Sequence, residues 1–353
     1  GETRIAQPAL FALQAALAAL LRSWGLPPDG VVGHSVGEIA ALHEAGVLSL
    51  REAIRVVWHR GRLMQEATGL GRMAAVGLAP EEAAEWIGSG GERLSLAAIN
   101  GPRSVVLSGE AAALEAVLAS LAARGVNHRM LPVDYAFHSV QMAPFQQRLV
   151  REMAGVKADS PRMALYSTVT GGSAADLPID AAFFGRNLRD PVRFADAIGA
   201  MADDGFDILV EIGPHPVLGS AIAECLASRE RPGTVLASLR RGRPEREGLL
   251  QACAGVFAAG IEPRWEAFQQ APGEVVSLPA YSWQRERHWI RPRPARPARG
   301  HREARGHPLL GHPLSAAAGV RIFEGGPSAS WLADHRIFGH VVRLAPEVLG
   351  DER

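Results

Sequence analysis

Apolar residues recur at helical spacing near the start of the chain, where three helices and one short strand are predicted. The first helix spans about residues 7–24 and ends before a glycine and two prolines. An apolar dipeptide at residues 31–32 indicates a strand, and a helical pattern follows at residues 38–42. Ser49, with a glutamate three residues later, is typical of a capping box and predicts a third helix over residues 49–68.

The periodicity changes over residues 71–137, where short apolar segments flank two helical ones. The predicted order is strand, helix, strand, strand, helix, strand, at residues 73–78, 80–87, 94–99, 104–108, 110–124 and 126–133. This is the order of a ferredoxin-like split βαβ unit. We expect residues 71–137 to form such a subdomain, inserted into a larger domain as one wall of a cleft.

Alternating helices and apolar strands return from residue 138, at residues 141–153, 163–167, 193–203, 208–212 and 217–227. Such alternation predicts a mostly parallel sheet covered on both faces. Residues 1–70 and 138–240 are therefore expected to form an α/β core of the α/β-hydrolase type. Another helix is predicted at residues 248–259, within a segment, 241–300, whose Pro-, Arg- and Ala-rich end is typical of a linker.

Composition and charge narrow the class of protein. The 353 residues exceed one ordinary domain, and 37 Lys and Arg balance 37 Asp and Glu, which leaves no net field for nucleic acid or an anionic membrane. Cys225 and Cys253 lie in apolar, helix-like segments, so we expect buried free thiols in a reducing cytoplasm. No membrane span or signal sequence is predicted, and because the sequence starts at Gly1 without Met, we expect a piece of a longer chain.

The pentapeptide Gly33-His34-Ser35-Val36-Gly37 lies between the predicted strand and the second helix. Glycines two residues before and two after a serine, in a strand-to-helix turn, are typical of a nucleophile elbow, because they leave room for a sharp turn. The serine would then lie at the N-terminus of the helix, where free N–H groups stabilise a developing oxyanion. Ser35 is therefore the predicted nucleophile.

A serine nucleophile needs a base, and His138 is the best-placed candidate because it follows a strand at the end of the predicted insertion. A histidine in such a place is often only a core or capping residue, so five others stay open, namely His34, His43, His59, His128 and His215. An α/β-hydrolase would place an acid between serine and histidine in chain order. Asp134 is the nearest, but strand alternation does not require it to face His138, and the acid stays unassigned.

Arg60 is the third candidate for chemistry, on the predicted helix at residues 49–68. An arginine on an amphipathic helix is usually a solvated surface residue. The functional alternative is a bidentate clamp for a substrate carboxylate, which suits the planar guanidinium group better than the ammonium group of a lysine.

Eight motifs, in order, resemble the acyltransferase domain of modular type I polyketide synthases. They are residues 7–10 (QPAL), 33–38 (GHSVGE), 60–65 (RGRLMQ), 71–76 (GRMAAV), 100–102 (NGP), 135–139 (YAFHS), 187–192 (NLRDPV) and 211–216 (EIGPHP). The resemblance covers residues 1 to about 290. Its last part is similar to the linker after the acyltransferase, marked by residues 278–287 (LPAYSWQRER).

This resemblance implies a mechanism. His138 would take the proton of Ser35, which attacks the thioester of malonyl-CoA, and the phosphopantetheine thiol of an acyl carrier protein would then attack the malonyl-serine ester. In this family a backbone carbonyl orients the histidine, which accounts for the missing acid. Arg60 would pair with the free carboxylate of the malonyl group. The resemblance implies neither a bound cofactor nor a metal in the domain itself.

Further site residues follow from the family. Val36 N–H would be one oxyanion donor, and the second would lie in a Gly-rich stretch that precedes this chain. Gln7 matches a glutamine that lines the site, and His34, Tyr135 and Phe137 are expected to contact the substrate. Phe137 would crowd an α-methyl group and Val36 stands where methylmalonyl types carry glutamine, so malonyl is the expected extender. Excluding one methyl group is worth only about 1–3 kcal/mol, so some leakage is expected.

The end of the chain resembles a second family. Residues 307–311 (HPLLG) and 331–339 (WLADHRIFG) are similar to the opening of a polyketide synthase dehydratase, a hot-dog fold whose first catalytic residue would be His335. Residues 301–353 are therefore expected to be the truncated start of that domain. The likeness ends near Arg343, where Leu344 replaces the family's proline, as a frameshift would produce. The dehydratase aspartate would lie beyond Arg353, so this segment is not expected to act alone.

Three other functions stay open. A methylmalonyl-specific acyltransferase would share the mechanism and differ in the extender. A serine hydrolase or esterase would share the elbow but would need a carboxylate on its histidine and no arginine clamp. A non-catalytic docking module is favoured if Ser35 cannot be acylated. The expected partners are malonyl-CoA, an acyl carrier protein, and the ketosynthase and dehydratase domains of the same polypeptide, with neither nucleic acid nor membrane.

Overall fold

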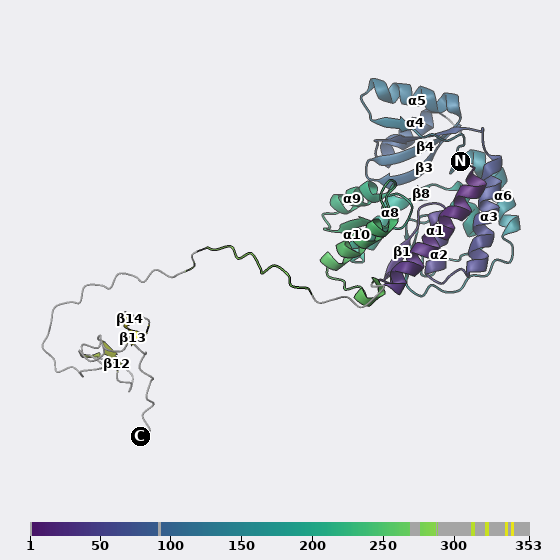
Figure 1. Ribbon diagram of the computed structural model, residues 1–353. Helices are drawn as coiled ribbons and strands as arrows, with labels where there is room; N and C mark the ends of the chain where they lie inside the picture. Colours follow the sequence, from purple (N-terminus) through teal and green to yellow (C-terminus); the bar gives the residue numbers. More distant parts are fainter. Residues whose placement is uncertain are drawn as a thin grey trace. The chain divides into compact units, whose positions relative to one another are not determined.

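The computed structural model describes residues 2–90, 93–268, 276–286 and 288, together with four strand segments at 312–314, 322–324, 336–337 and 340–341. The chain divides into two units, residues 1–275 and 276–353. The first unit contains helices α1 to α10 and strands β1 to β10, several of which are labelled in Figure 1, and every predicted site residue except His335. His335 lies outside the described residues.

Two small sheets with parallel pairs form the α/β core of the first unit. β1 (Gly30–Val32) pairs in parallel with β6 (Ala164–Ser167), and β7 (Gly172–Ser173) adds an antiparallel edge. β9 (Ile208–Glu211) pairs in parallel with β10 (Thr234–Ala237). The core is thus of the mixed α/β class, as the alternation of helices and apolar strands predicts.

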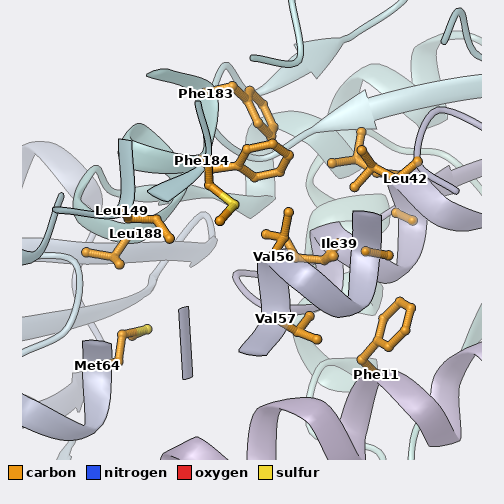
Figure 2. Packing of buried hydrophobic residues seen from close by; sticks show 14 of the residues in the cluster. Phe11, Ile39, Leu42, Val56, Val57, Met64, Leu149, Phe183, Phe184 and Leu188 are labelled. Carbon is orange, nitrogen blue, oxygen red and sulfur yellow. The ribbon is translucent and has the colours of Figure 1, made fainter. Parts of the chain in front are cut away.

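Helices pack around these sheets (Figure 1). α1 (Thr3–Ser23) packs on α2 (Gly37–Glu44) and α3 (Leu50–Glu66), and α6 (Ala143–Glu152) packs between α3 and α7 (Ala181–Arg189). Figure 2 shows their shared apolar core, in which Phe11, Ile39, Val57 and Phe184 are almost fully buried. α8 (Phe194–Asp203), α9 (Gly219–Ser228) and α10 (Glu245–Ala258) pack on the strands of the second part of the unit.

Several elements differ from the prediction. α1 begins at Thr3 and contains Pro8, so it starts earlier than the expected residue 7. α7 was not predicted, because a nine-residue helix that contains Gly185 has little periodicity. The strands β7 and β10 were not predicted either. α1 is also long and apolar enough to span a membrane by length and composition, contrary to the expectation, although Phe11 and Leu17 on it are buried within the unit.

A second sheet system follows the predicted order of strand, helix, strand, strand, helix, strand. Its elements are β2 (Arg72–Val76), α4 (Pro80–Gly90), β3 (Leu94–Gly101), β4 (Ser104–Gly109), α5 (Ala111–Ala123) and β5 (His128–Met130). The strands lie antiparallel in the order β5-β2-β4-β3, and β8 (Val192–Arg193) joins the sheet in parallel with β3. Ala74, Leu107 and Leu114 belong to its own apolar core. A strand from outside residues 71–137 therefore connects this sheet to the α/β core.

A cavity of about 1130 Å³ lies between the two sheet systems. Residues of β1, β9 and α1 line it on the core side. Asn100 and Leu131, both within residues 71–137, line it on the other side. Ser35 and His138 also border this cavity, so the candidate nucleophile and base lie where the two parts of the unit meet.

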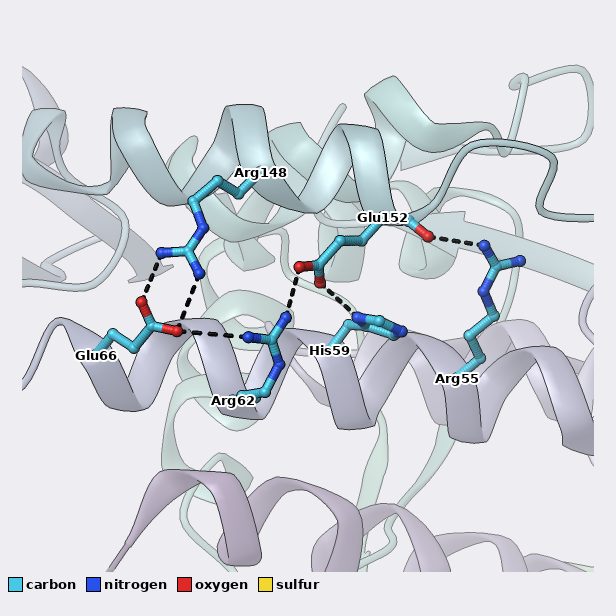
Figure 3. Close-up of polar contacts among 6 residues, drawn as sticks. All are labelled: Arg55, His59, Arg62, Glu66, Arg148 and Glu152. Carbon is cyan, nitrogen blue, oxygen red and sulfur yellow. Dashed lines mark hydrogen bonds and ion pairs between the residues drawn. The ribbon is translucent and has the colours of Figure 1, made fainter.

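Six side chains connect α3 to α6 through polar contacts (Figure 3), namely Arg55, His59, Arg62, Glu66, Arg148 and Glu152. The Glu152 carboxylate binds both His59 and Arg62. Arg148 binds the Glu66 carboxylate with two nitrogens, at 2.5 and 3.1 Å. Single pairs of this partly exposed kind are worth about 1 kcal/mol or less, but together they constrain α3, the helix that carries Arg60.

The second unit contains two antiparallel strand pairs. β11 (His312–Leu314) pairs with β12 (Ile322–Glu324), and β13 (Arg336–Ile337) pairs with β14 (His340–Val341). The hot-dog fold expected for residues 301–353 stays a prediction.

Candidate active site

Ser35 lies in the turn between β1 and α2. Its φ angle is 55°, in the left-handed region that residues other than glycine rarely adopt. A Cβ atom at Gly33 would lie 2.3 Å from the backbone nitrogen of Glu38, so only glycine fits there. A Cβ atom at Gly37 would meet nothing closer than the side-chain nitrogen of Gln14, at 3.7 Å. The prediction that both glycines make room is therefore right for Gly33 and wrong for Gly37.

His138 contacts Ser35 directly. Its Nε2 lies 2.8 Å from Ser35 Oγ, and its Nδ1 lies 2.9 Å from the backbone oxygen of Asp190, at the end of α7. A carbonyl oxygen only accepts, so Nδ1 carries the proton and Nε2 accepts the hydroxyl hydrogen of Ser35. A backbone carbonyl thus orients the imidazole, as the resemblance implies.

The five other candidate histidines hydrogen-bond to other residues. The partners are Asn100 for His34, the Leu48 carbonyl for His43, Glu152 for His59, the Val126 carbonyl for His128 and the Arg241 N–H for His215. Asp134 pairs with Arg72, and its side chain is 63% exposed. Within the described part of the chain, no carboxylate hydrogen-bonds to His138, so the site is a dyad of Ser35 and His138.

Arg60 extends from α3 to the same hydroxyl and is only 1% exposed. Its Nη2 donates to Ser35 Oγ at 2.9 Å, and its Nη1 donates to Gln7 Oε1 at 2.7 Å. Its Nε donates to Asn187 Oδ1 at 3.1 Å. Three of the five guanidinium N–H groups therefore have partners among the described residues, which leaves two for an anion. The interpretation of Arg60 as a solvated surface residue is wrong.

Burial and charge set the protonation states in the site. Burial lowers the pKa of Arg60 to about 10, so its side chain stays charged at neutral pH. Burial and, next, the Arg60 cation lower the pKa of His138 to about 3, against the opposite effect of its hydrogen bond to Asp190. His138 is therefore neutral in the resting site and can accept the proton of Ser35.

The remaining predicted residues surround the dyad. The rings of Tyr135 and Phe137 stack with centroids 3.7 Å apart and planes inclined by 12°. Both rings, together with His34 and Val36, line the cavity. No hydrogen bond within the described residues uses the Val36 N–H, which lies next to Ser35 at the start of α2. Gln7 reaches the site only through Arg60.

Two buried residues of the site were missed from the sequence. Glu38 is 1% exposed and Asn187 is 3% exposed, and Asn187 joins Glu38 to Arg60. A signal was present for Asn187, because Asp180 caps α7 and places the asparagine on the face that buries Phe183 and Phe184. A polar residue on a buried helix face needs polar partners, so it marks a polar site.

Comparison with known proteins now gives the family. Residues 1–263 match the family described as "Acyl transferase domain". The chain is 41% identical over 350 residues to the spectinabilin polyketide synthase system protein NorA' of Streptomyces orinoci, covering 96% of this chain and 10% of that protein. It is 40% identical over 291 residues to the erythronolide synthase EryA2 of Saccharopolyspora erythraea, covering 82% and 8%. The chain thus spans about a tenth of the length of these relatives.

Solved structures of acyltransferase domains resemble this chain as well. The acyltransferase domain from module 8 of the salinomycin polyketide synthase superposes with a TM-score of 0.73 at 35% identity, covering 75% of this chain and 63% of that one. The acyltransferase domain of SpnD, in complex with 2-(pent-4-yn-1-yl)malonyl, gives a TM-score of 0.66 at 31% identity, covering 72% and 61%. The chain therefore belongs to the acyltransferase domains of modular polyketide synthases. It is a transferase.

Proposed function

We propose that this domain transfers a malonyl unit from malonyl-CoA to the phosphopantetheine thiol of an acyl carrier protein, through an ester on Ser35. The observation that carries the proposal is the buried Arg60, whose Nη2 lies 2.9 Å from Ser35 Oγ. A guanidinium group so close to the nucleophile, with two N–H groups to spare, fits an acyl group that ends in a carboxylate. The SpnD domain, which was solved with a substituted malonyl group, supports this substrate class.

The chemistry follows from the contacts of the dyad. His138 Nε2 takes the proton of Ser35 as Oγ bonds to the thioester carbon, and the Val36 N–H stabilises the oxyanion. The C–S bond then breaks, and His138 returns the proton to the leaving thiolate. In the second half the carrier thiol gives its proton to His138 and attacks the ester, and Ser35 Oγ leaves with that proton. Each half-reaction restores the neutral imidazole.

The stacked rings support malonyl over methylmalonyl as the extender. Phe137 is 8% exposed and packs against Tyr135 immediately before His138, so its ring has little freedom to move away from an added methyl group. We therefore assign malonyl as the substrate and methylmalonyl as the slower alternative, with a discrimination of about 1–3 kcal/mol.

The proposal also covers the rest of the chain. We propose residues 71–137 as a ferredoxin-like subdomain, since its elements follow that order and β8 links it to the core. Residues 301–353 are proposed as the start of a dehydratase from their motifs. Neighbouring ketosynthase and dehydratase domains, a cytoplasmic location and the absence of a bound cofactor belong to the same proposal.

Intact-protein mass spectrometry tests the function. The chain is incubated with malonyl-CoA, methylmalonyl-CoA or acetyl-CoA, beside the Ser35→Ala and Arg60→Ala variants. We expect a malonyl adduct that Ser35→Ala abolishes and that Arg60→Ala reduces far more for malonyl than for acetyl. Turnover of simple esters without any acyl adduct from malonyl-CoA would replace the transferase with a hydrolase. No adduct and no turnover would favour a docking module.

A further inference from the structure

Asn187 contacts Arg60 and links it to a second buried polar residue, Glu38. Asn187 Oδ1 accepts from Arg60 Nε at 3.1 Å, and Asn187 Nδ2 donates to Glu38 Oε2 at 2.9 Å. The same Nδ2 donates to the backbone oxygen of Ser35 at 3.2 Å. Asn187 therefore contacts the clamp, the nucleophile's backbone and a buried carboxylate at once.

The direction of the Asn187 amide is fixed by its partners. A guanidinium N–H can only donate, so the oxygen of Asn187 must face Arg60. The nitrogen of the same amide then faces Glu38, whose Oε2 accepts from it at 2.9 Å. Reversing the amide would place donor against donor at Arg60, and that contact would be lost.

Glu38 is in turn held by residues that follow β6. Its carboxylate accepts from the Ser167 hydroxyl, from the Thr168 N–H at 3.2 Å and from the Thr168 hydroxyl at 3.0 Å. Because Asn187 stands between them, Glu38 and Arg60 are not in ion-pair contact. Glu38 therefore favours the charged form of Arg60, since it raises the Arg60 pKa against the larger lowering by burial, and it does not occupy the free N–H groups of Arg60.

We propose that Asn187 and Glu38 are positioning residues that hold the Arg60 guanidinium against Ser35 and keep it unpaired, so that preference for a carboxylate-bearing acyl-CoA depends on them. This inference rests on the proposed function, since it needs Arg60 to bind the substrate carboxylate. It goes beyond that function by placing the origin of acyl-group selection in residues that never touch the substrate.

Two variants interrupt the chain of contacts at different points. Asn187→Leu keeps the number and branching of the side-chain heavy atoms and removes all three hydrogen bonds of Asn187. Glu38→Gln keeps the shape of the side chain. The oxygen of the new glutamine must accept from the Thr168 N–H, so the glutamine nitrogen faces Asn187 and forces the Asn187 amide to reverse. Ser108→Ala is the matched control, because Ser108 is a fully buried hydroxyl in β4, in the other sheet system.

The measurement is kcat/KM for acylation of Ser35 by malonyl-CoA and by acetyl-CoA in the full chain. We expect each variant to lower the malonyl-to-acetyl ratio roughly 10- to 100-fold, the size of a hydrogen bond to a charged group, toward the ratio of Arg60→Ala. The double variant Asn187→Leu/Glu38→Gln should lose no more selectivity than Asn187→Leu alone, because Glu38 acts through Asn187. The Ser108→Ala ratio should equal that of the wild-type chain.

The outcomes distinguish a failure of this inference from a failure of the proposed function on which it rests. If the wild-type chain shows no Arg60-dependent preference for malonyl, the proposed function fails, and the inference with it. If wild type and Arg60→Ala behave as proposed, an unchanged ratio in Glu38→Gln or Asn187→Leu overturns the inference alone. An equal loss with both substrates also overturns it, because that is what a purely structural role would give.

Discussion

At the scale of single residues, the site combines backbone strain with burial. Ser35 and His138 have φ angles of 55° and 56°, and such conformations cost about 1–3 kcal/mol each and persist only where the surroundings impose them. At Ser35 the surroundings are the close approach of Gly33 to the start of α2. The third non-glycine residue with positive φ, Glu230, lies just past α9, where helix ends commonly adopt this conformation.

The two glycines of the elbow should respond differently to alanine. Gly33→Ala would put a Cβ atom 2.3 Å from backbone atoms that cannot move, so we expect loss of the folded elbow and of Ser35 acylation. Gly37→Ala has open space and lies in the first turn of α2, where alanine is up to about 1 kcal/mol better than glycine. Thermal melts and acylation of the two variants check this. Equal damage from both would contradict the role given to Gly33.

The pH dependence of acylation should show that the charge of Arg60 lowers the pKa of His138. With its pKa lowered to about 3, His138 stays an acceptor well below pH 6.5, so the rate with a neutral ester should stay flat from pH 8 to about 5. Arg60→Ala removes the second largest cause of the shift, so the rate should begin to fall at a higher pH. Burst kinetics of a nitrophenyl ester measure this limb. An acid limb at the same pH in both proteins would exclude the electrostatic effect.

Only those site residues that have a local sequence signal could be predicted from the sequence. The turn at Ser35 is identifiable because Gly33 has a local steric cause. His138 competes with five other histidines until the fold brings its Nε2 to 2.8 Å from Ser35 Oγ. Arg60 on its helix looks like a surface residue, and only the packing of α1 and α7 against α3 and its neighbours buries it. Contacts between distant segments, such as the Asp190 carbonyl on His138, leave no local pattern.

At the scale of elements, the long helices were all predictable from the sequence, whereas some of the short elements were not. α3 carries a capping box, in which Ser49 accepts from the Glu52 N–H at 3.2 Å, and the structure places the helix as expected. β10 was missed, although β6 and β9 have the same length and were predicted. α7 was missed because nine residues that include Gly185 give little periodicity, although it supplies both Asn187 and the residue before Asp190. The least predictable helix is thus one that builds the site.

The polar contacts between α3 and α6 should stabilise the helix that carries Arg60. Glu152→Gln weakens the contacts to His59 and Arg62, and we expect a loss of about 1 kcal/mol of unfolding free energy at low salt. The loss should shrink in 1 M salt, where the Debye length is about 3 Å. Urea unfolding measures both, with the exposed Glu115 of α5, changed to Gln, as the matched control. Equal effects in the two variants would show that the contacts add nothing.

At the scale of the whole molecule, the first unit continues beyond the predicted end of the α/β core at residue 240. α10 buries Leu249, Cys253 and Val256, and Leu249 packs with Leu17 of α1. After α10, the Arg264 N–H donates to the carbonyl of Trp24 at 2.8 Å. The family match to residue 263 and the unit boundary at residue 275 place the end of the domain in the same stretch. We therefore propose that the linker begins after residue 268, not at 241.

Truncation tests this boundary. Cutting after residue 240 would expose the partners of Leu249 and Val256, whose burial is worth about 1.5–3 kcal/mol each, out of a total stability of about 5–15 kcal/mol for an ordinary domain. We expect residues 1–240 to be unfolded or aggregated, whereas residues 1–275 should keep the main melting transition of the full chain and its acylation by malonyl-CoA. Circular dichroism melts of the three chains make the comparison. If residues 1–240 melted cooperatively at the temperature of residues 1–275, α10 would be dispensable and the domain would end at residue 240.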